Sequence, residues 1–360
     1  MIELKPYRWF GEREKAAVME VMDSGVLSAF VAGPPDERGK EVNGGVWVRK
    51  LESAWELRYD VKHAISFNSA TSGLLAACKA VNIQPGDHVI TTPWTMSATV
   101  AAAKYCGAII DFADIEAETY CIDPSRVVEI LERNARDGIV TQAIMAVNLF
   151  GHPAEIMRLR SITDYWPGLK LIEDSAQTPL ATENGRVAGT VGHIGVYSLN
   201  AHKHIQAGEG GIAITDDDDL AMRMRSIRNH GVDPLGLNLR MTELEAAVAF
   251  VQLQDIDKHV MRRRLLGDMM TLALRDVMGV PAVRQGCQHD YYLWTAKTKK
   301  WPHSVPCIRG YIQPLHRIFA DGVSCPVVER MRESVVCFET CRWDIPDPTR
   351  LIEAIRDGVR

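Results

Sequence analysis

One lysine in this chain has neighbours that suit covalent chemistry on an aldehyde. Lys203 lies between Ser198 and the glycine-rich turn Gly208-Glu-Gly-Gly211. Upstream, the hydrophobic run Leu169-Lys-Leu-Ile-Glu-Asp174 ends in acid. Pyridoxal phosphate needs a lysine that forms a Schiff base with its aldehyde and an acid that pairs with its pyridine nitrogen. The order of these residues therefore predicts an enzyme with pyridoxal phosphate as cofactor, Lys203 as its Schiff-base residue and Asp174 as the acid.

Each of these residues also has an ordinary structural explanation. A single lysine in a polar segment is usually a surface residue, and an acid after a strand is usually a helix cap. Gln177 follows Asp174 by three residues and could hydrogen-bond the ring oxygen of the cofactor or simply begin a helix. The catalytic interpretation is favoured because Lys203, Asp174 and Ser198 occur together in an order that suits one site.

A phosphate site is predicted at the start of a helix. The segment Asn68-Ser-Ala-Thr-Ser-Gly73 lies between a predicted strand and an apolar helical run. Backbone amides at a helix N-terminus bind phosphate, so we expect the amides of Ala70 and Thr71, the Thr71 hydroxyl and the Ser198 hydroxyl to face it. A capping turn of small residues without a ligand is the alternative.

The face of the cofactor ring needs a flat or polarisable neighbour. The segment Thr92-Pro-Trp-Thr-Met-Ser-Ala-Thr99 supplies Met96 for that position, with Trp94 close by. A thioether packs well on an aromatic face. Either side chain could instead belong to the hydrophobic core.

The composition is that of an ordinary globular protein. The chain has 360 residues, 46% hydrophobic and 24% charged, with a net charge of −5. That length predicts two domains, or one large domain with a smaller satellite. An acidic chain without a basic tail is a poor partner for nucleic acid or an anionic membrane. Without an apolar signal core or a stretch of about 18 apolar residues, we expect a soluble, cytoplasmic protein.

Metal binding is not predicted. The eight cysteines form no C-x-x-C pair and have no histidine at zinc-ligand spacing, so we expect reduced and mostly buried thiols. The run Asp216-Asp-Asp-Asp219 lacks the spaced ligands and the glycine of a calcium loop. A solvated turn that begins a helix explains it better.

Short β-branched runs alternate with longer helical ones from Val61 to Thr215. Such alternation predicts βαβ units and an α/β fold with a mostly parallel sheet between helices. A helix is expected at 11–24 and a loop at 31–46. Expected strands cover 63–68, 88–92, 108–111, 141–147, 170–173, 194–198 and 211–215, and expected helices cover 71–81, 98–106, 124–135 and 154–165.

The C-terminal part has a different character. One long helical pattern runs from Thr242 to Val277, and Thr242 with Glu245 forms a possible capping box. Strands are expected at 291–298 and 335–338, and a terminal helix at 348–359. We therefore divide the chain into a large cofactor-binding domain, residues 1–250, and a smaller C-terminal α+β domain, residues 251–360.

Several motifs occur in a fixed order, and together they are specific. They are Asn68-Ser-Ala-Thr-Ser-Gly-Leu74, Glu173-Asp-Ser-Ala-Gln177, Ser198-Leu-Asn-Ala-His-Lys-His204, Gly208-Glu-Gly-Gly211, Arg228-Asn-His-Gly231, Gly236-Leu-Asn-Leu-Arg-Met-Thr-Glu-Leu-Glu-Ala-Ala247, Gly310-Tyr-Ile-Gln-Pro-Leu315 and Cys325-Pro-Val-Val-Glu-Arg330. This set resembles the DegT/DnrJ/EryC1/StrS family of pyridoxal-phosphate-dependent sugar aminotransferases, which have the aspartate-aminotransferase fold type I. The likeness extends over nearly the whole chain.

The resemblance implies a homodimer with active sites at the interface between subunits. In such enzymes an asparagine of one subunit reaches the phosphate bound by the other, and this position corresponds to Asn238, with Arg240 and His230 nearby. Many members carry an aromatic residue where this chain has Met96. That departure affects the stacking on the cofactor ring rather than cofactor binding.

The resemblance also implies transamination in two half-reactions with ping-pong kinetics. Lys203 would hold the cofactor as an internal aldimine, release it to L-glutamate or L-glutamine, and then act as general base and acid. The acceptor would be a keto-sugar, commonly a nucleotide-linked one, or a related keto-cyclitol or aldehyde. Its specificity is expected in the loops 26–45 and 183–190 and in the second subunit.

Two alternatives stay open. Some relatives are sugar dehydratases that use pyridoxal or pyridoxamine phosphate, and these replace the lysine by histidine. This chain keeps Lys203, although His202 and His204 flank it. A non-catalytic regulator or sensor that retains the fold is the other alternative, and it would normally add a DNA-binding or transmembrane segment.

Overall fold

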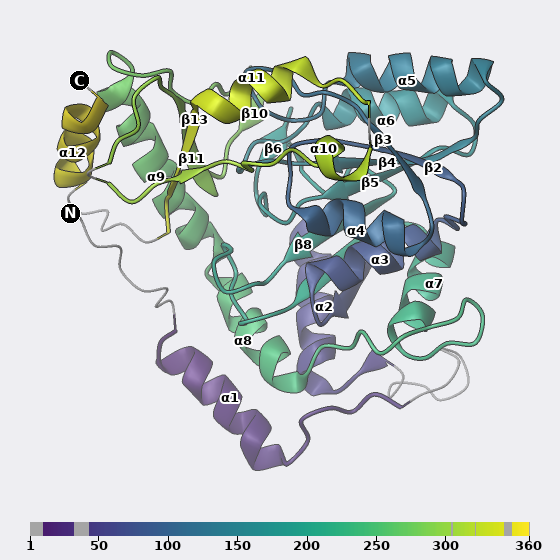
Figure 1. Ribbon diagram of the computed structural model, residues 1–360. Helices are drawn as coiled ribbons and strands as arrows, with labels where there is room; N and C mark the ends of the chain where they lie inside the picture. Colours follow the sequence, from purple (N-terminus) through teal and green to yellow (C-terminus); the bar gives the residue numbers. More distant parts are fainter. Residues whose placement is uncertain (1–9, 32–42, 304, 321, 342–347, 360) are drawn as a thin grey trace.

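A computed structural model describes residues 10–31, 43–303, 305–320, 322–341 and 348–359. Its centre is a seven-stranded sheet in the order β1-β9-β8-β5-β4-β2-β3, with helices on both faces (Figure 1). Only the pairs made by β9 are antiparallel, and the other pairs in this sheet are parallel. The predicted α/β fold is therefore confirmed. The strands are β1 (His63–Phe67), β2 (His88–Thr91), β3 (Ile109–Phe112), β4 (Thr141–Val147), β5 (Lys170–Asp174), β8 (Ile194–Ser198) and β9 (Gly211–Thr215).

The sheet is buried on both faces, as parallel sheets are. Along β1, Phe67 packs into a core shared with α3 and α7. Ala64, whose side chain lies on the opposite face of the sheet, packs into a core shared with α2 and α8. The period of two along the strand explains this alternation. The helices around the sheet are α1 (Glu12–Ser24), α2 (Val46–Tyr59), α3 (Ala70–Ala80), α4 (Ser97–Tyr105), α5 (Pro124–Arg136), α6 (Ile156–Tyr165), α7 (Asp218–Arg228) and α8 (Glu243–Gln254).

The sequence reading missed helix α2, because its N-terminus is capped by a distant residue. The N-cap Gly45 has no side chain. Instead the buried carboxylate of Glu243, at the start of α8, accepts hydrogen bonds from the backbone amides of Gly45 (3.0 Å), Trp47 (2.7 Å) and Val48 (3.4 Å). The residues next to Gly45 in the sequence do not predict such a cap. The expected loop 31–46 lies largely outside the described residues, and Val46 begins this helix.

Other differences concern where elements begin and end. The helical pattern from Thr242 to Val277 forms two helices, because the chain bends at Asp255 between α8 and α9 (Ile256–Leu274). The expected specificity loop at 183–190 contains the end of β6 (Thr182–Glu183) and all of β7 (Arg186–Val187). The predicted capping box of Thr242 with Glu245 is confirmed at α8, and the acidic run 216–219 begins helix α7 as expected, with Asp217 as its N-cap.

The C-terminal part builds a second, smaller core. Side chains of α9, such as Leu266 and Met270, pack with Trp294, Phe338 and Ile355 from the small sheet and the terminal helix. The division at 250/251 stays a prediction, and these two residues lie within α8. The elements are β10 (Cys287–Gln288), β11 (Leu293–Lys297), β12 (Ile308–Arg309), α10 (His316–Phe319), α11 (Pro326–Ser334), β13 (Val335–Glu339) and α12 (Thr349–Val359).

Two further observations concern the chemistry of the chain as a whole. All eight cysteines are free thiols; Cys287 and Cys307 are half-buried and the others are buried. In the described part of the chain, no helix combines the length and apolarity needed to cross a membrane.

The cap on α2 can be tested by removing the Glu243 carboxylate. Glu243→Ala should lower the free energy of unfolding by about 2–3 kcal/mol, because three amides lose a charged, buried acceptor. Glu245→Ala, which removes an exposed cap of α8, serves as the control and should cost about 1 kcal/mol. Urea unfolding of both variants measures the difference. Equal losses in the two variants would contradict the long-range cap.

Candidate active site

The carboxyl ends of several strands meet at one edge of the sheet, where open α/β sheets bind ligands. A cavity of about 260 Å³ lies at this edge. It lies beside the residues that follow β1, β2, β5 and β8. Every cofactor residue predicted from the sequence lines it except Asn238. The lining residues are Ser69, Ala70, Thr71, Leu74, Thr95, Met96, Ala98, Asp174, Ala176, Gln177, Ser198, Asn200, His202, Lys203 and Glu209.

Lys203 is buried, with 8% of its surface exposed. Its Nζ lies 4.2 Å from the centre of the Tyr292 ring. Burial lowers the pKa of Lys203 to about 8; the Asp174 carboxylate opposes this shift and the Arg263 guanidinium adds to it. Arg263 also donates a hydrogen bond to the Lys203 carbonyl oxygen (3.1 Å), which fixes the backbone. A neutral amine is therefore accessible near neutral pH, as a Schiff-base residue requires.

The loop that carries Lys203 joins the antiparallel strands β8 and β9. The Leu199 amide donates to the Gly210 carbonyl (2.9 Å), and the Ala201 amide donates to the Gly208 carbonyl (3.0 Å). The lysine is thus presented by a loop whose two ends are held together by the backbone.

Asp174 ends β5 and is also buried. Burial raises its pKa, while hydrogen bonds from Thr99 and the Ala176 amide, together with the charge of Lys203, act in the opposite direction. The Thr99 hydroxyl donates to Oδ2 (2.7 Å) and the Ala176 amide donates to Oδ1 (3.2 Å). Both oxygens are therefore fixed, which suits a carboxylate that pairs with a ring N–H.

The expected phosphate cradle is present as a helix N-terminus. Ser69 caps α3 by accepting a hydrogen bond from the Ser72 amide (3.1 Å), and Ala70 and Thr71 form the first turn. The amides of a first turn have no intrahelical acceptor. Gly211 lies against this turn so closely that a Cβ there would be 2.5 Å from the Ala70 nitrogen. The residues at this end of the cavity therefore fit a phosphate group.

Met96 and Gln177 line the cavity, whereas Trp94, the other aromatic candidate of the same segment as Met96, does not. Met96 is the N-cap of α4 and is 59% exposed at the cavity. Trp94 is fully buried and packs edge-on against Tyr120 and Phe150, so it belongs to the core. The Gln177 side chain is held by two hydrogen bonds: its Oε1 accepts from the Phe150 amide (2.7 Å), and its Nε2 donates to the Tyr311 hydroxyl (3.2 Å).

Asn238 does not reach the cavity of its own chain. It is exposed and pairs with Asn229 in a short antiparallel bridge. Arg240 donates a hydrogen bond to the Asn229 side chain (3.0 Å), and the exposed His230 occupies the turn between them with φ 56°. In one chain these three residues are therefore separate from the rest of the predicted site.

Sequence reasoning missed Thr99, Arg263, Tyr292 and Tyr311. A hydroxyl inside a helix and an arginine within a charged helical stretch carry no signal that links them to Asp174 or Lys203. The two tyrosines come from the segments after β10 and β12, and only the tertiary fold brings them to this edge.

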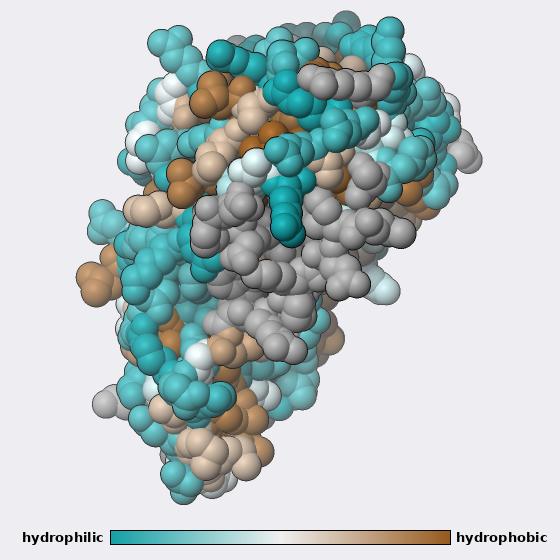
Figure 2. All heavy atoms as spheres, turned by 90° about the vertical axis from the view of Figure 1, so that its left-hand side faces the viewer, coloured by the Kyte–Doolittle hydropathy of each residue, from teal (hydrophilic) through white to brown (hydrophobic). Residues whose placement is uncertain are grey.

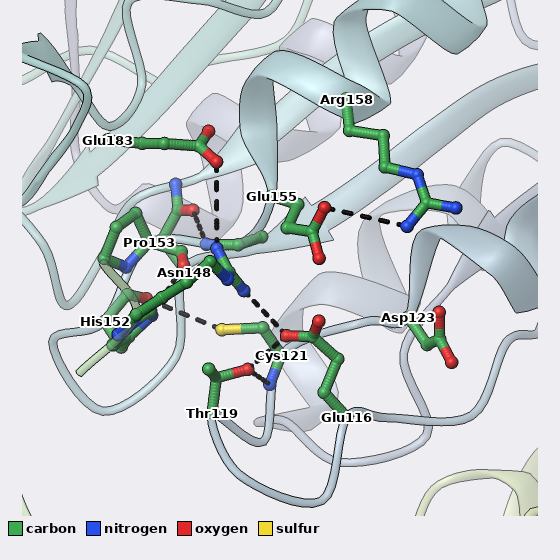
Figure 3. Close-up of polar contacts among 12 residues, drawn as sticks. Glu116, Thr119, Cys121, Asp123, Asn148, His152, Pro153, Glu155, Arg158 and Glu183 are labelled. Carbon is green, nitrogen blue, oxygen red and sulfur yellow. Dashed lines mark hydrogen bonds and ion pairs between the residues drawn. The ribbon is translucent and has the colours of Figure 1, made fainter. Parts of the chain in front are cut away.

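A polar cluster outside the cavity holds the turn that follows β4 (Figure 3). Asn148 donates to Glu173 (3.1 Å) and Ser175 (2.8 Å) and accepts from the Ala154 amide (2.8 Å). His152 Nδ1 bonds the Pro153 carbonyl (2.7 Å), and burial lowers its pKa to about 4. In the described ranges, no group of three or more histidine, cysteine, aspartate or glutamate side chains could hold a metal ion.

Comparison with known proteins identifies the family. The model of the DegT/DnrJ/EryC1/StrS aminotransferase family matches residues 36–304. The chain therefore belongs to this family, as the motifs predict, and its class is that of an enzyme.

Individual relatives match over most of their own length, and a solved structure shares the fold. The chain is 30% identical to GDP-perosamine synthase of Caulobacter vibrioides over 79% of this chain and 74% of that protein. It is 32% identical to a pleiotropic regulatory protein of Geobacillus stearothermophilus, over 80% and 76% respectively. The crystal structure of S. venezuelae DesV in complex with a ketimine intermediate superposes with a TM-score of 0.85 at 26% identity and covers 97% of this chain and 95% of that chain.

The lowered pKa of Lys203 predicts a pH profile for its reactivity. Acylation of the apoprotein with acetic anhydride, followed by mass spectrometry of each lysine peptide, should give a Lys203 profile with its midpoint near 8. Reactivity rises with pH because only the neutral amine is nucleophilic, and burial disfavours the charged form. The exposed Lys104 provides an internal reference for reagent strength. A Lys203 midpoint near its ordinary value of 10.5 would mean that water solvates this amine.

Proposed function

We propose that this chain is a pyridoxal-phosphate-dependent aminotransferase that moves an amino group from L-glutamate or L-glutamine to a keto-sugar. The preferred candidate for the acceptor is a nucleotide-linked keto-sugar, and a related keto-cyclitol or aldehyde is the alternative. One observation carries the proposal: a single cavity joins a buried lysine of lowered pKa, a buried aspartate with both oxygens held, and a helix N-terminus. Family membership and the likeness to GDP-perosamine synthase support a sugar as acceptor.

The residues divide the work by position. Bound pyridoxal phosphate would supply an electron sink for bond changes at the substrate carbon. Lys203 would hold the aldehyde and afterwards accept and return the substrate proton at its Nζ. Asp174 would keep the proton on the ring nitrogen, and the first turn of α3 would hold the phosphate with Ser198. Met96 would cover one face of the ring.

The two alternatives are judged by the same residues. A dehydratase of the related type carries histidine in place of the lysine, whereas here Lys203 itself lines the cavity and His204 is bonded to the Asp290 carbonyl (3.2 Å). A regulatory role is the second candidate, because one relative is named a pleiotropic regulatory protein. A complete donor half-reaction would favour catalysis over regulation.

We further propose a homodimer with shared active sites. Asn238 is exposed, and in the same loop the apolar side chains of Val232 and Leu235 are 90% and 74% exposed. Figure 2 shows apolar side chains among polar ones at the lower end of the molecule, the level of α1, where Met19 and Met22 are exposed. A second copy would cover such groups and bring Asn238 to the phosphate.

A cytoplasmic location would keep the eight cysteines reduced.

The donor half-reaction tests the function directly. Purified protein with pyridoxal phosphate should show a visible absorbance band that disappears on addition of L-glutamate or L-glutamine, while the pyridoxamine band grows. Lys203→Ala should lack the band and lose activity by several orders of magnitude, because Lys203 is the one lysine among the described residues that line the cavity. A stable wild-type band that ignores both donors would favour the regulator or the dehydratase. Normal turnover by Lys203→Ala would exclude the assigned lysine.

A mixing experiment tests the shared site. Lys203→Ala and Asn238→Ala should each be nearly inactive as homodimers. After the two variants are mixed and exchanged, activity should return to about a quarter of the wild-type level, because half of the dimers then carry one intact site of two. If each subunit used its own Asn238, mixing would restore nothing.

A further inference from the structure

The orientation of the Gln177 amide is fixed by its partners. Its Oε1 accepts the Phe150 amide at 2.7 Å, and a backbone amide can only donate. The nitrogen Nε2 therefore lies on the other side, where one of its hydrogens points to the Tyr311 hydroxyl at 3.2 Å. Because Gln177 also lines the cavity, its second N–H remains for a ligand. Gln177 can thus offer a donor, its Nε2, to a ligand in the cavity, while its Oε1 is held by the Phe150 amide.

The Phe150 side of this arrangement is rigid. Phe150 has φ 57°, a left-handed conformation that a bulky residue adopts only where its surroundings hold it there. Its carbonyl accepts a hydrogen bond from the Leu293 amide (3.1 Å). Asn148 and His152 hold the turn from either end (Figure 3). The donor to Gln177 is therefore held in place by contacts outside the cavity.

The Tyr311 side is equally well supported. Its carbonyl accepts from Trp94 Nε1 (2.7 Å), and its ring stacks on Phe150 with 6.0 Å between centres and 11° between planes. Gly310 permits this approach, since a Cβ there would be 2.8 Å from the Trp94 ring. Burial raises the pKa of Tyr311, so its hydroxyl stays protonated. Tyr311 does not line the cavity, so it acts on a ligand through residues that do, and Gln177 is the side chain that bonds its hydroxyl directly.

We propose that Tyr311 is a positioning residue that aims the Gln177 N–H at the phenolic oxygen of the bound cofactor. This inference rests on the proposed function. A donor to that oxygen stabilises its anionic form. When the cofactor is bound, this oxygen would share a proton with the Lys203 nitrogen, and the hydrogen bond from Gln177 would lower the pH at which that proton is lost. Through Tyr311, the C-terminal part of the chain would therefore influence the pH at which the Lys203 nitrogen loses this proton.

The test is a pH titration of the visible absorbance of the cofactor-loaded protein. Tyr311→Phe keeps the ring and the Trp94 contact but removes the acceptor for Nε2. The spectral midpoint should rise by about 0.5–1 pH unit, which corresponds to the loss of one hydrogen bond. Gln177→Ala should raise it at least as much. In the Gln177→Ala background, Tyr311→Phe should add no further shift.

Two controls separate this effect from a change in packing. Tyr120 belongs to the same aromatic cluster, and its side-chain hydrogen bond is to Thr295 rather than to Gln177. Tyr120→Phe should therefore leave the midpoint unchanged. Gln177→Glu is a second variant that does not depend on Tyr311→Phe folding well; it puts an acceptor toward the ring oxygen and should raise the midpoint further.

The outcomes are distinct. A normal wild-type band with an unchanged midpoint in Tyr311→Phe or in Gln177→Glu overturns the positioning role and leaves the proposed function intact. Equal shifts from Tyr311→Phe with and without Gln177 also overturn it, because Tyr311 would then act independently. Absence of the band in the wild-type protein removes the proposed function and this inference together.

Discussion

A buried amine beside a buried carboxylate is the constraint on which this structure depends. Both groups lose hydration, and a buried charge is tolerated only when partners replace the lost water. Asp174 has two hydrogen-bond donors, Thr99 and the Ala176 amide. Lys203 has the face of the Tyr292 ring, and Arg263 places a positive charge near enough to oppose protonation of the amine. Together these contacts hold both carboxylate oxygens in place and let the amine lose its proton.

The local part of the site could be predicted from the sequence. Asp174 ends one buried strand, Lys203 lies in the loop after another, and Ala70 and Thr71 begin the helix after β1, so each position is set by a short segment. The mostly parallel sheet follows from the alternation of strand and helix patterns. These predictions succeed because burial on both faces and helix capping leave local traces in the residue order.

The remainder depends on contacts between distant segments. Helix α2 is capped by Glu243, 195 residues away from Val48 in the sequence, and among the described residues around Gly45 none takes the place of that carboxylate. The break at Asp255 has no glycine or proline to mark it. Thr99 and Tyr311 are residue types that occur in many structural environments. Their contacts with Asp174 and Gln177 can be recognised only when α4 and the C-terminal segment are placed against β5. Sequence patterns report what a segment needs locally and not which partner will supply it.

The cavity is lined by four separated segments of the chain, beginning near residues 69, 95, 174 and 198. None of these segments could form the cavity alone, so a ligand held there binds the folded chain and has no comparable site on the unfolded one. By mass action, occupancy then becomes folding free energy, about 2.7 kcal/mol at a ligand concentration of 100 times the Kd. The supply of cofactor would thus affect how much of this protein survives proteolysis, in addition to its effect on the catalytic rate.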